Sequence, residues 1–202
     1  MSSEAYRPWI RAGLTFIMPS DSTGRTTRQK RGSENDTFEF SDLLIAVYIA
    51  IPTYVANSTP VLTGGGGPID QGRRFIDGRP ILGANKTAKG FTYGLLLGSA
   101  AGLAEAALFT NYALAFVGIA ASLGALLGDL FGAFLKRRLN IPPGNPLPLI
   151  DQLDFILGAL LLTSPLLQLT LGSVLILVVV TVPVHLLSNA IAYALRLKSR
   201  FW

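Results

Sequence analysis

The sequence contains no cysteine and a single histidine, His185. The absence of cysteine excludes disulfides and thiolate metal sites, and one histidine cannot form a histidine-rich metal centre. Charged residues are also scarce: they make up 14% of the chain, whereas 50% of the residues are hydrophobic. For His185, which lies in an apolar segment beside Pro183, we expect packing or hydrogen bonding rather than a proton relay. The composition therefore favours a membrane protein.

Two long stretches carry almost no charge. Residues 155–195 contain no formally charged side chain, and residues 91–128 contain only Glu105. A helix of about 20 apolar residues crosses a bilayer, so each stretch is long enough for two helices. Turn signals at residues 109–111 and 165–172 divide the two stretches.

Residues 43–62 form a further uncharged segment, which Pro52, Asn57 and Pro60 mark as irregular. We expect this segment to be broken or bent near its far end. The predicted fold class is an all-α integral membrane protein with about five transmembrane helices and two functional loops. We expect residues 1–40 to form a polar, mobile tail and residues 41–202 to form the transmembrane domain.

The basic residues set the predicted orientation. Residues 63–89, the segment after Phe131 and the C-terminus are rich in lysine and arginine, whereas the two short alternate loops contain none. The positive-inside rule assigns the basic loops and the C-terminus to the cytoplasm, and an odd number of spans then places the N-terminus outside. The basic residues of the N-terminal tail conflict with this last assignment. We expect a multi-pass protein of the cell membrane.

Glycines recur every four residues in the second and third predicted helices. Strips of small residues let helices approach closely in lipid, where little hydrophobic force drives helices together. We therefore interpret the strips as packing surfaces, and we interpret the nearby Glu105 as a hydrogen-bonded structural group. The strips are Gly90, Gly94, Gly98 and Gly102, and Gly124, Gly128 and Gly132.

The first predicted cytoplasmic loop, residues 63–89, combines four consecutive glycines, two aspartates and five cations. A glycine run lets backbone N–H groups approach phosphate oxygens, although flexibility alone is the simpler explanation. Lys86 and Lys89 lead directly into the next span, so both ammonium groups should lie at the membrane surface near a helix N-terminus, which is an anion site. Snorkelling lysines would give the same pattern.

Residues 126–155 carry the strongest signal. Asp129 and Lys136 share one face if their helix continues past the apolar segment, and Asp151 and Asp154 share a face at the start of the next helix. A proline- and glycine-rich turn joins the two helices, so three carboxylates can converge below the membrane surface. Carboxylate oxygens suit a hard cation such as Mg²⁺. Helix capping is the alternative for Asp151 and Asp154, but the neighbouring cations favour a metal–phosphate site.

This stretch, which contains GDLFGAFLKRRLNIPPGNPLPLIDQLDF, resembles the GD, KR, proline-glycine and D-x-x-D pattern of the membrane cytidylyltransferases that make CDP-diacylglycerol. The motifs YVANSTPVL, GPIDQG and DGRPILGANKTAKGF are similar to those of the archaeal branch, the CDP-archaeol synthases. The resemblance covers residues 42–202. Because the chain lacks the His-Gly-Gly run that the diacylglycerol branch has before its D-x-x-D pair, no histidine role is transferred.

The resemblance implies that CTP reacts with unsaturated archaetidic acid, an isoprenoid glycerol ether phosphate, to give CDP-archaeol and pyrophosphate. We assign one or two Mg²⁺ ions to Asp129, Asp151 and Asp154, and count Lys86 with them as catalytic. Asn57 is either a substrate contact or a group that satisfies the helix break. The nucleotide candidates are Lys86, Thr87, Lys89, Asn57 and Asp70, and the candidates for the lipid phosphate or the leaving pyrophosphate are Lys136, Arg137 and Arg79.

Two other classes of membrane protein are alternatives to this family. A CDP-alcohol phosphotransferase has a D-G followed after two residues by Ala-Arg, whereas Asp77 and Gly78 precede RPIL, and Asp151 and Asp154 are spaced three apart rather than four. A small transporter would place its site near the bilayer midplane, whereas the charges here cluster at one surface. The expected partners are CTP, the lipid phosphate and membrane lipid, without nucleic acid, and no oligomeric state is predicted.

Overall fold

The computed structural model describes residues 39–143 and 145–197, and over these residues the chain is helical apart from loops and two isolated bridges. The predicted mobile tail and the last basic residues of the chain fall outside the described residues, apart from Glu39 and Phe40. The helices are α2 (Phe40–Thr63), α3 (Ala88–Leu108), α4 (Ala113–Arg138), α5 (Ile150–Thr163) and α6 (Leu171–Ala194).

Four of these helices, α2, α3, α4 and α6, are long and apolar enough to cross a membrane. The fifth, α5, has 14 residues. At about 1.5 Å per residue α5 is roughly 21 Å long, which is shorter than the hydrocarbon core of about 30 Å. The prediction of an all-α multi-pass membrane protein is confirmed, and the helix expected as the fourth span is present in a short form.

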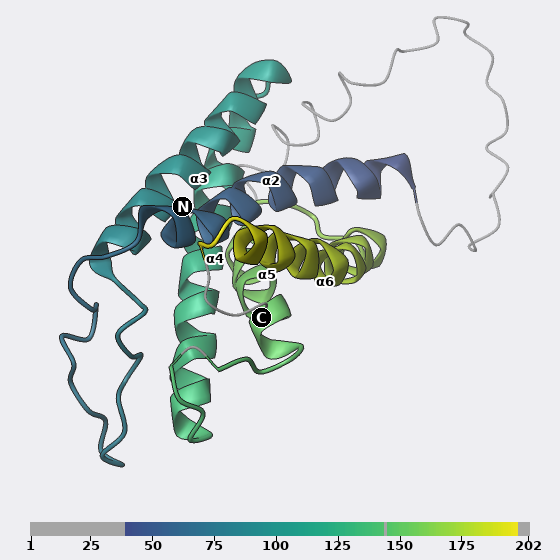
Figure 1. Ribbon diagram of the computed structural model, residues 1–202. Coiled ribbons are helices and arrows are strands. Elements are labelled where there is room, and N and C mark those ends of the chain that lie inside the picture. Colours follow the sequence, from purple (N-terminus) through teal and green to yellow (C-terminus); the bar gives the residue numbers. More distant parts are fainter. Residues whose placement is uncertain (1–38, 144, 198–202) are drawn as a thin grey trace, which may run out of the picture.

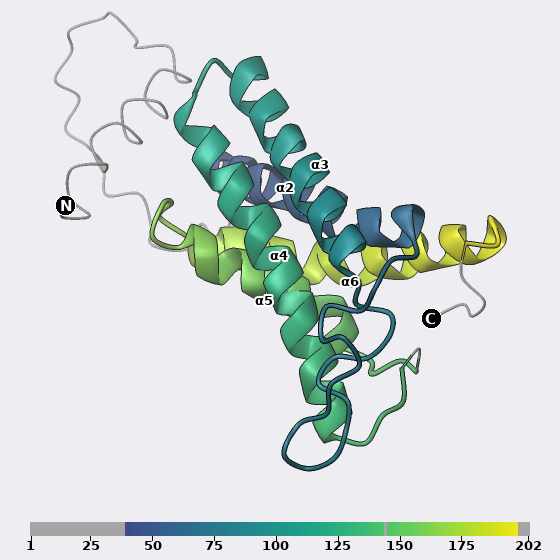
Figure 2. The same ribbon diagram turned by 90° about the vertical axis from the view of Figure 1, so that its left-hand side faces the viewer.

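The helix α2 lies at the centre of the molecule, in contact with α3, α4, α5 and α6. The pair α3 and α4 runs side by side, and α2 and α6 cross this pair (Figures 1 and 2). Hydrogen bonds join α2 to α6 at two levels, from the Thr170 hydroxyl to Asp42 and between the hydroxyls of Tyr54 and Thr181. Because α2 is central, it packs against the helices on both of its sides.

The helix α2 contains both Pro52 and Pro60 and is nevertheless assigned as one continuous helix. The predicted break near its far end is therefore absent. Pro60 has no N–H to offer the carbonyl of Ala56. That carbonyl faces Gly94 of α3, where a Cβ would lie 2.7 Å from the oxygen. Close packing against glycine thus supports the helix where proline removes a hydrogen bond.

The glycine strips lie in helix contacts, as predicted. A Cβ on Gly102 of α3 would lie 2.5 Å from the Cα of Gly118, so α3 and α4 touch backbone to backbone. On α4, a Cβ on Gly128 would collide with the carbonyl oxygen of Asp154, and one on Gly132 would collide with the carboxylate of the same residue. Because these two glycines have no side chains, the start of α5, with its aspartates, packs directly against α4.

Among the described residues, the Glu105 carboxyl group does not have the hydrogen bonding predicted for it. It is buried, yet its Oε1 has no hydrogen-bond partner among the described residues, and the same is true of the nearby buried hydroxyl of Tyr48. His185 packs against Phe155 with ring centroids 5.8 Å apart, in agreement with the predicted packing role.

The α2–α3 loop, residues 64–87, and the α4–α5 loop, residues 139–149, lie at the same end of the molecule (Figure 2). This placement agrees with the prediction that both loops share one side of the membrane. The long helix α4 reaches this end with Lys136, Arg137 and Arg138 in its last turn. The charged residues singled out in the sequence are therefore gathered where the two loops meet.

Candidate functional site

Lys86, in the α2–α3 loop, reaches across to Asp129 on α4. Its Nζ lies 2.6 Å from both carboxylate oxygens, and each side chain is 26% exposed. Burial alone would lower the pKa of Lys86, but the charge and hydrogen bonds of Asp129, with the charges of Asp154 and Asp151, raise it above its ordinary value. Lys86 therefore remains a cation at neutral pH and cannot act as a base.

A second ion pair joins α4 to α5. The Nζ of Lys136 lies 2.8 Å from both carboxylate oxygens of Asp151. One of these oxygens also accepts a hydrogen bond of 2.9 Å from the backbone N–H of Leu147, which precedes α5. Asp151 thus fastens the chain before α5 and faces a cation, whereas the N-cap of α5 is Leu149, without a side-chain capping hydrogen bond.

The third aspartate, Asp154, lies between these pairs on the second turn of α5. Its Oδ1 accepts a hydrogen bond of 2.7 Å from the N–H of Phe155, and no lysine or arginine of the described residues forms an ion pair with it. Burial, together with the negative charge of Asp129, raises the pKa of Asp154 above its usual range. A carboxylate in this environment favours the arrival of a further positive charge.

The three aspartates do not form a ready-made metal site. Among the described residues, no three carboxylate or histidine side chains are grouped so that they could hold a metal ion as they stand. Two of the three aspartates instead face lysines. The set still offers only oxygen donors, which are the donors that Mg²⁺ prefers, and Asp154 has no cationic partner, so the chemistry of these residues fits that ion.

Arg137 is placed differently from its neighbours. It is only 5% exposed, and its Nε and Nη1 are buried without a hydrogen-bond partner among the described residues. The other loop packs closely against it, since a Cβ on Gly83 would lie 3.7 Å from the Arg137 Nη1 and 3.2 Å from the side chain of Pro143. Arg137 therefore lies where the α2–α3 and α4–α5 loops meet.

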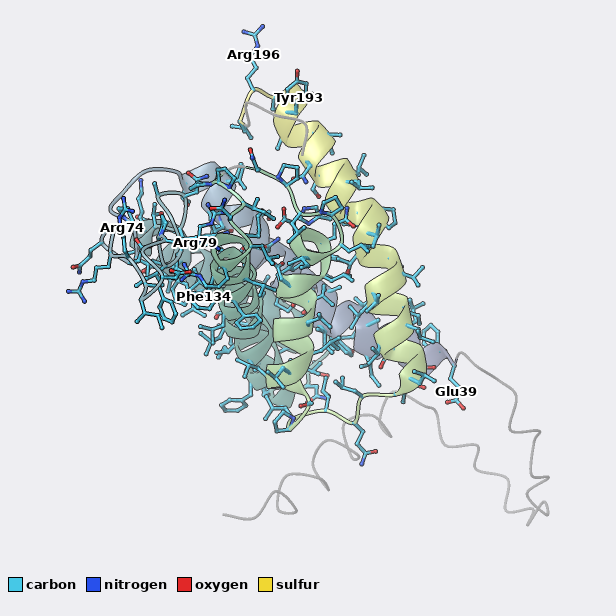
Figure 3. The ribbon with its side chains drawn as sticks, turned by 90° about the horizontal axis from the view of Figure 1, so that it is seen from below. Glu39, Arg74, Arg79, Phe134, Tyr193 and Arg196 are labelled. Carbon is cyan, nitrogen blue, oxygen red and sulfur yellow. The ribbon has the colours of Figure 1, made fainter. Side chains whose placement is uncertain are left out.

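The tip of the α2–α3 loop is a small hairpin, residues 73–81, fastened to the end of α4. The guanidinium of Arg138 lies 4.8 Å from the ring centroid of Phe75 and 4.9 Å from that of Phe134, and its Nη1 lies 2.6 Å from Asp77. Arg79 donates a hydrogen bond to the carbonyl of Arg138. Figure 3 shows Arg79 and Phe134 on the same flank of the molecule. We call the set of Phe75, Asp77, Phe134 and Arg138 the hairpin latch.

The sequence reasoning did not find the latch. Phe134 and Arg138 are four residues apart, so the helix places them on one face, and this spacing was the available signal. Their partners Phe75 and Asp77 lie about 60 residues earlier, a distance over which periodicity carries no information.

Asp70 organises the interior of the same loop. Its carboxylate accepts backbone hydrogen bonds from Gly72 at 3.0 Å, Leu82 at 2.8 Å and Gly83 at 3.0 Å. Burial would raise the pKa of Asp70, but these N–H donors outweigh burial and hold the pKa below its usual range. The backbone N–H of Ile69 donates to the carbonyl of Lys86 at 2.8 Å. Asp70 thus holds together the loop that presents Lys86, and both of its carboxylate oxygens accept hydrogen bonds within that loop.

The remaining nucleotide candidates lie around the start of α3. Thr87 is the N-cap, and its hydroxyl accepts a hydrogen bond of 3.1 Å from the N–H of Gly90. Lys89 is exposed, and the glycine run passes over its stem, because a Cβ on Gly66 would lie 3.0 Å from the Cβ of Lys89. Gly66 has φ +90, a backbone conformation that side chains disfavour, so the run is conformationally required and not merely flexible. The amide of Asn57 is half-buried on α2.

Four long apolar helices with a cluster of carboxylates and cations at one end define a class of protein. It is a multi-pass membrane protein whose charged site lies where the helices meet the loops, as suits an intramembrane enzyme that handles phosphate groups.

Comparison with known proteins narrows this class. The family model for CDP-archaeol synthase (CarS-like) matches residues 40–202. The CDP-archaeol synthase of Pyrococcus furiosus is 44% identical over 164 residues, 79% of this chain and 98% of the relative. That of Methanocaldococcus jannaschii is 40% identical over 172 residues, 79% of this chain and 97% of the relative. A solved structure of an intramembrane enzyme for archaeal membrane lipids biosynthesis shares 42% identity and a TM-score of 0.66, over 72% of this chain and 93% of that chain.

The chain belongs to the CDP-archaeol synthase family. Members of this family are cytidylyltransferases of archaeal lipid synthesis, so the chain is an enzyme and a multi-pass membrane protein. The resemblance inferred from the motifs at residues 126–155 is thereby confirmed.

Proposed function

We propose that the enzyme transfers CMP from CTP to the phosphate of unsaturated archaetidic acid, giving CDP-archaeol and pyrophosphate. An oxygen of the lipid phosphate attacks the α-phosphorus of CTP. The bond from that phosphorus to the oxygen bridging the β-phosphorus breaks, and its electron pair leaves with pyrophosphate. The observation that carries the proposal is the alternation of Asp129, Asp151 and Asp154 with Lys86 and Lys136 across α4, α5 and the α2–α3 loop.

The attacking group needs no base from the protein. A phosphate monoester has a second pKa of about 6 and is largely ionised at neutral pH. The work left to the enzyme is to position two anionic substrates in line and to neutralise the charge that develops on the leaving group. Lys86 suits the neutralising role because the surrounding carboxylates keep it protonated.

Mg²⁺ is the proposed cofactor, held by Asp129, Asp151 and Asp154. When bound, it would supply charge neutralisation and polarisation at the phosphate oxygens. Asp154 has no ion pair within the described part of the chain, and its pKa is raised first by burial and then by the negative charge of Asp129. Asp129 and Asp151 add two further carboxylates beside their lysines. The residues thus accept a divalent cation on chemical grounds.

The two lysines are proposed to exchange partners when substrate binds. Lys86 and Lys136 now face Asp129 and Asp151, and each can turn on a flexible four-carbon stem toward a phosphate oxygen a few ångströms away. That movement frees the two carboxylates for the cation. Ion pairs that are partly exposed contribute little to stability, so their exchange requires little free energy.

The groups at the start of α3 are proposed to hold the nucleotide. Lys89 is exposed above the helix N-terminus, where backbone N–H groups and the helix dipole favour an anion. Thr87 caps that helix and orients its first N–H groups. Asn57 is proposed as a polar contact to substrate, and Asp70 as the group that positions the loop.

The lipid phosphate is proposed to approach from the bilayer, on the cytoplasmic side. The site lies at the loop end of apolar helices, so a substrate with long isoprenoid tails can keep those tails in lipid and present its phosphate to the cluster. Placing both basic loops in the cytoplasm follows the positive-inside rule and puts the site on the side that holds CTP.

The test is turnover of the purified protein in detergent with labelled CTP, Mg²⁺ and a choice of acceptor. The proposal predicts label in the lipid fraction with unsaturated archaetidic acid and much less with a diacyl phosphatidic acid. Asp151→Asn should abolish transfer, and Asp77→Asn, which removes the same charge from an ion pair in the hairpin latch, should retain it. No transfer by folded wild-type protein would contradict the proposal.

A further inference from the structure

Arg137 is a buried cation that lies within the field of Asp151 but whose guanidinium is not fully hydrogen-bonded among the described residues. It is 5% exposed, and two of its guanidinium nitrogens, Nε and Nη1, are buried and have no hydrogen-bond partner among the described residues. Its neighbours on α4 each form an ion pair, Lys136 with Asp151 and Arg138 with Asp77, although the Nε of Arg138 is also buried without a hydrogen-bond partner among the described residues. Buried guanidinium nitrogens without hydrogen bonds are costly unless an anion completes them.

The surroundings of Arg137 are constructed by both loops. Gly83 of the α2–α3 loop and Pro143 of the α4–α5 loop meet beside its guanidinium. Gly83 has φ +101, and a Cβ there would press on Pro143 at 3.2 Å, so glycine is required at this point. The Asp70 carboxylate accepts the N–H of Gly83 and thereby holds this part of the loop in place.

Arg137 also lies farther along α4 than the carboxylates. It follows Asp129 by eight residues in a continuous helix, which places it about 12 Å farther along the axis toward the loop end. The lipid phosphate is tied to tails that remain in the bilayer, whereas the β- and γ-phosphates of CTP leave as a soluble product. The loop end of the site is therefore the place for the soluble product.

We propose that Arg137 is the binding residue for the leaving pyrophosphate, at an enclosed anion site formed by Gly83, Pro143 and the end of α4. The inference rests on the proposed cytidylyl transfer and assigns one of its two phosphate groups to Arg137. The planar guanidinium can bind two phosphate oxygens at once, which a lysine cannot do. The lipid phosphate is left to Lys136, which faces Asp151.

Pyrophosphate binding tests this without requiring turnover. Mg²⁺ and pyrophosphate should raise the melting temperature of the full-length wild-type protein in detergent, and Arg137→Gln should remove that rise. Arg137→Lys should bind pyrophosphate more weakly than wild type and better than Arg137→Gln. The matched control is Arg74→Gln, because Arg74 is exposed and its hydrogen bond goes only to Gly78 in its own hairpin.

Kinetics then separate the two phosphates. In reverse, an oxygen of pyrophosphate attacks the cytidine-bearing phosphorus of CDP-archaeol, the bond to the lipid phosphate oxygen breaks, and CTP and the lipid phosphate form. Arg137→Gln should raise the KM for pyrophosphate in this direction at least about tenfold, and should change the forward KM for the lipid phosphate by less than about twofold.

Three results would overturn the proposal. A raised forward KM for the lipid phosphate with unchanged pyrophosphate binding would assign Arg137 to the lipid. Unchanged KM values for pyrophosphate and for the lipid phosphate in a folded Arg137→Gln variant would show that Arg137 has only a structural role. Equal stabilisation of wild type and Arg137→Gln by pyrophosphate would place the anion elsewhere. If the wild type binds pyrophosphate but fails to use CTP and the lipid, the proposed function fails while the anion site stands.

Discussion

The ammonium of Lys86 lies 2.6 Å from each carboxylate oxygen of Asp129, and so joins the α2–α3 loop to α4 across the site. Both side chains are 26% exposed. An ion pair this accessible contributes about 1 kcal/mol or less to stability, so its placement is explained by what it can bind rather than by what it holds together. The same end of the molecule contains the Lys136–Asp151 pair and Asp154, which forms no ion pair with the residues that the structure describes.

Lys86→Gln should impair catalysis far more than folding. Loss of the charge that neutralises the phosphates should lower kcat/KM for CTP about a hundredfold, within the range typical of removing one electrostatic contact in an active site. The melting temperature in detergent should change little, because the pair is partly exposed. Arg74→Gln serves as the control for loss of one cation in the same loop. Turnover of Lys86→Gln within about threefold of wild type would contradict the role given to Lys86.

Asp154→Asn should weaken the response to Mg²⁺. The substitution keeps the size of the side chain and removes a carboxyl group that can ionise when a cation binds and that forms no ion pair among the described residues. We expect the Mg²⁺ concentration for half-maximal rate to rise at least about tenfold, as is typical of the loss of an ionic ligand. Chelation with EDTA should stop the wild-type enzyme, and added Mg²⁺ should restore it. Unchanged Mg²⁺ titration curves for wild type and Asp154→Asn would remove Asp154 from the metal site.

Gly102→Ala should destabilise the protein. The added methyl group would meet the Cα of Gly118 at 2.5 Å, and neither backbone can move without separating α3 from α4. Overpacking of this kind costs about 1–3 kcal/mol and should lower the melting temperature by several degrees. Gly67→Ala is the matched control, because a Cβ there meets nothing within 4 Å. Equal melting temperatures for the two variants would show that the helices tolerate separation at Gly102.

Arg138→Lys should loosen the hairpin at residues 73–81. Lysine keeps the charge opposite Asp77 but loses the contacts of the planar guanidinium with the rings of Phe75 and Phe134. Amide hydrogen exchange at Phe75 and Ile81, which donate within the hairpin, should therefore become faster.

The internal control for Arg138→Lys is the amide of Ile69, next to Asp70, which donates a hydrogen bond to the carbonyl of Lys86. Its rate of hydrogen exchange should not change. Faster exchange at Ile69 as well would mean that the hairpin latch and the hydrogen bonds around Asp70 open together. Unchanged exchange at Phe75 would mean that the latch does not hold the hairpin.

The helices were largely predictable because their signals are local. Uncharged stretches and turn residues located the helix ends, and the four- and three-residue spacings from Asp129 to Lys136 placed both on the face that meets α5 and the loop. Of the break or bend predicted in α2, the break is wrong, because α2 is one continuous helix in which the Ala56 carbonyl packs against Gly94 of another helix. Sequence periodicity within α2 contains no information about that neighbour.

The site was predictable as a set of residues but not as a set of partners. The three aspartates and the flanking cations were identified, yet which lysine faces which aspartate depends on contacts between distant segments. The sequence predicts Asp70 as a nucleotide candidate, and only the folded loop shows that its oxygens accept hydrogen bonds from Gly72, Leu82 and Gly83. Burial of Arg137 likewise arises where two loops meet.

The most direct test of the central claim follows the fate of two labels in one CTP molecule, one on the cytosine ring and one on the γ-phosphate. Purified wild-type protein in detergent would receive this CTP, Mg²⁺ and unsaturated archaetidic acid. The account predicts the cytosine label in the lipid fraction and an equal amount of the γ-label in free pyrophosphate. Appearance of the γ-label in the lipid, or release of the cytosine label as CMP without a cytidine-bearing lipid, would contradict it.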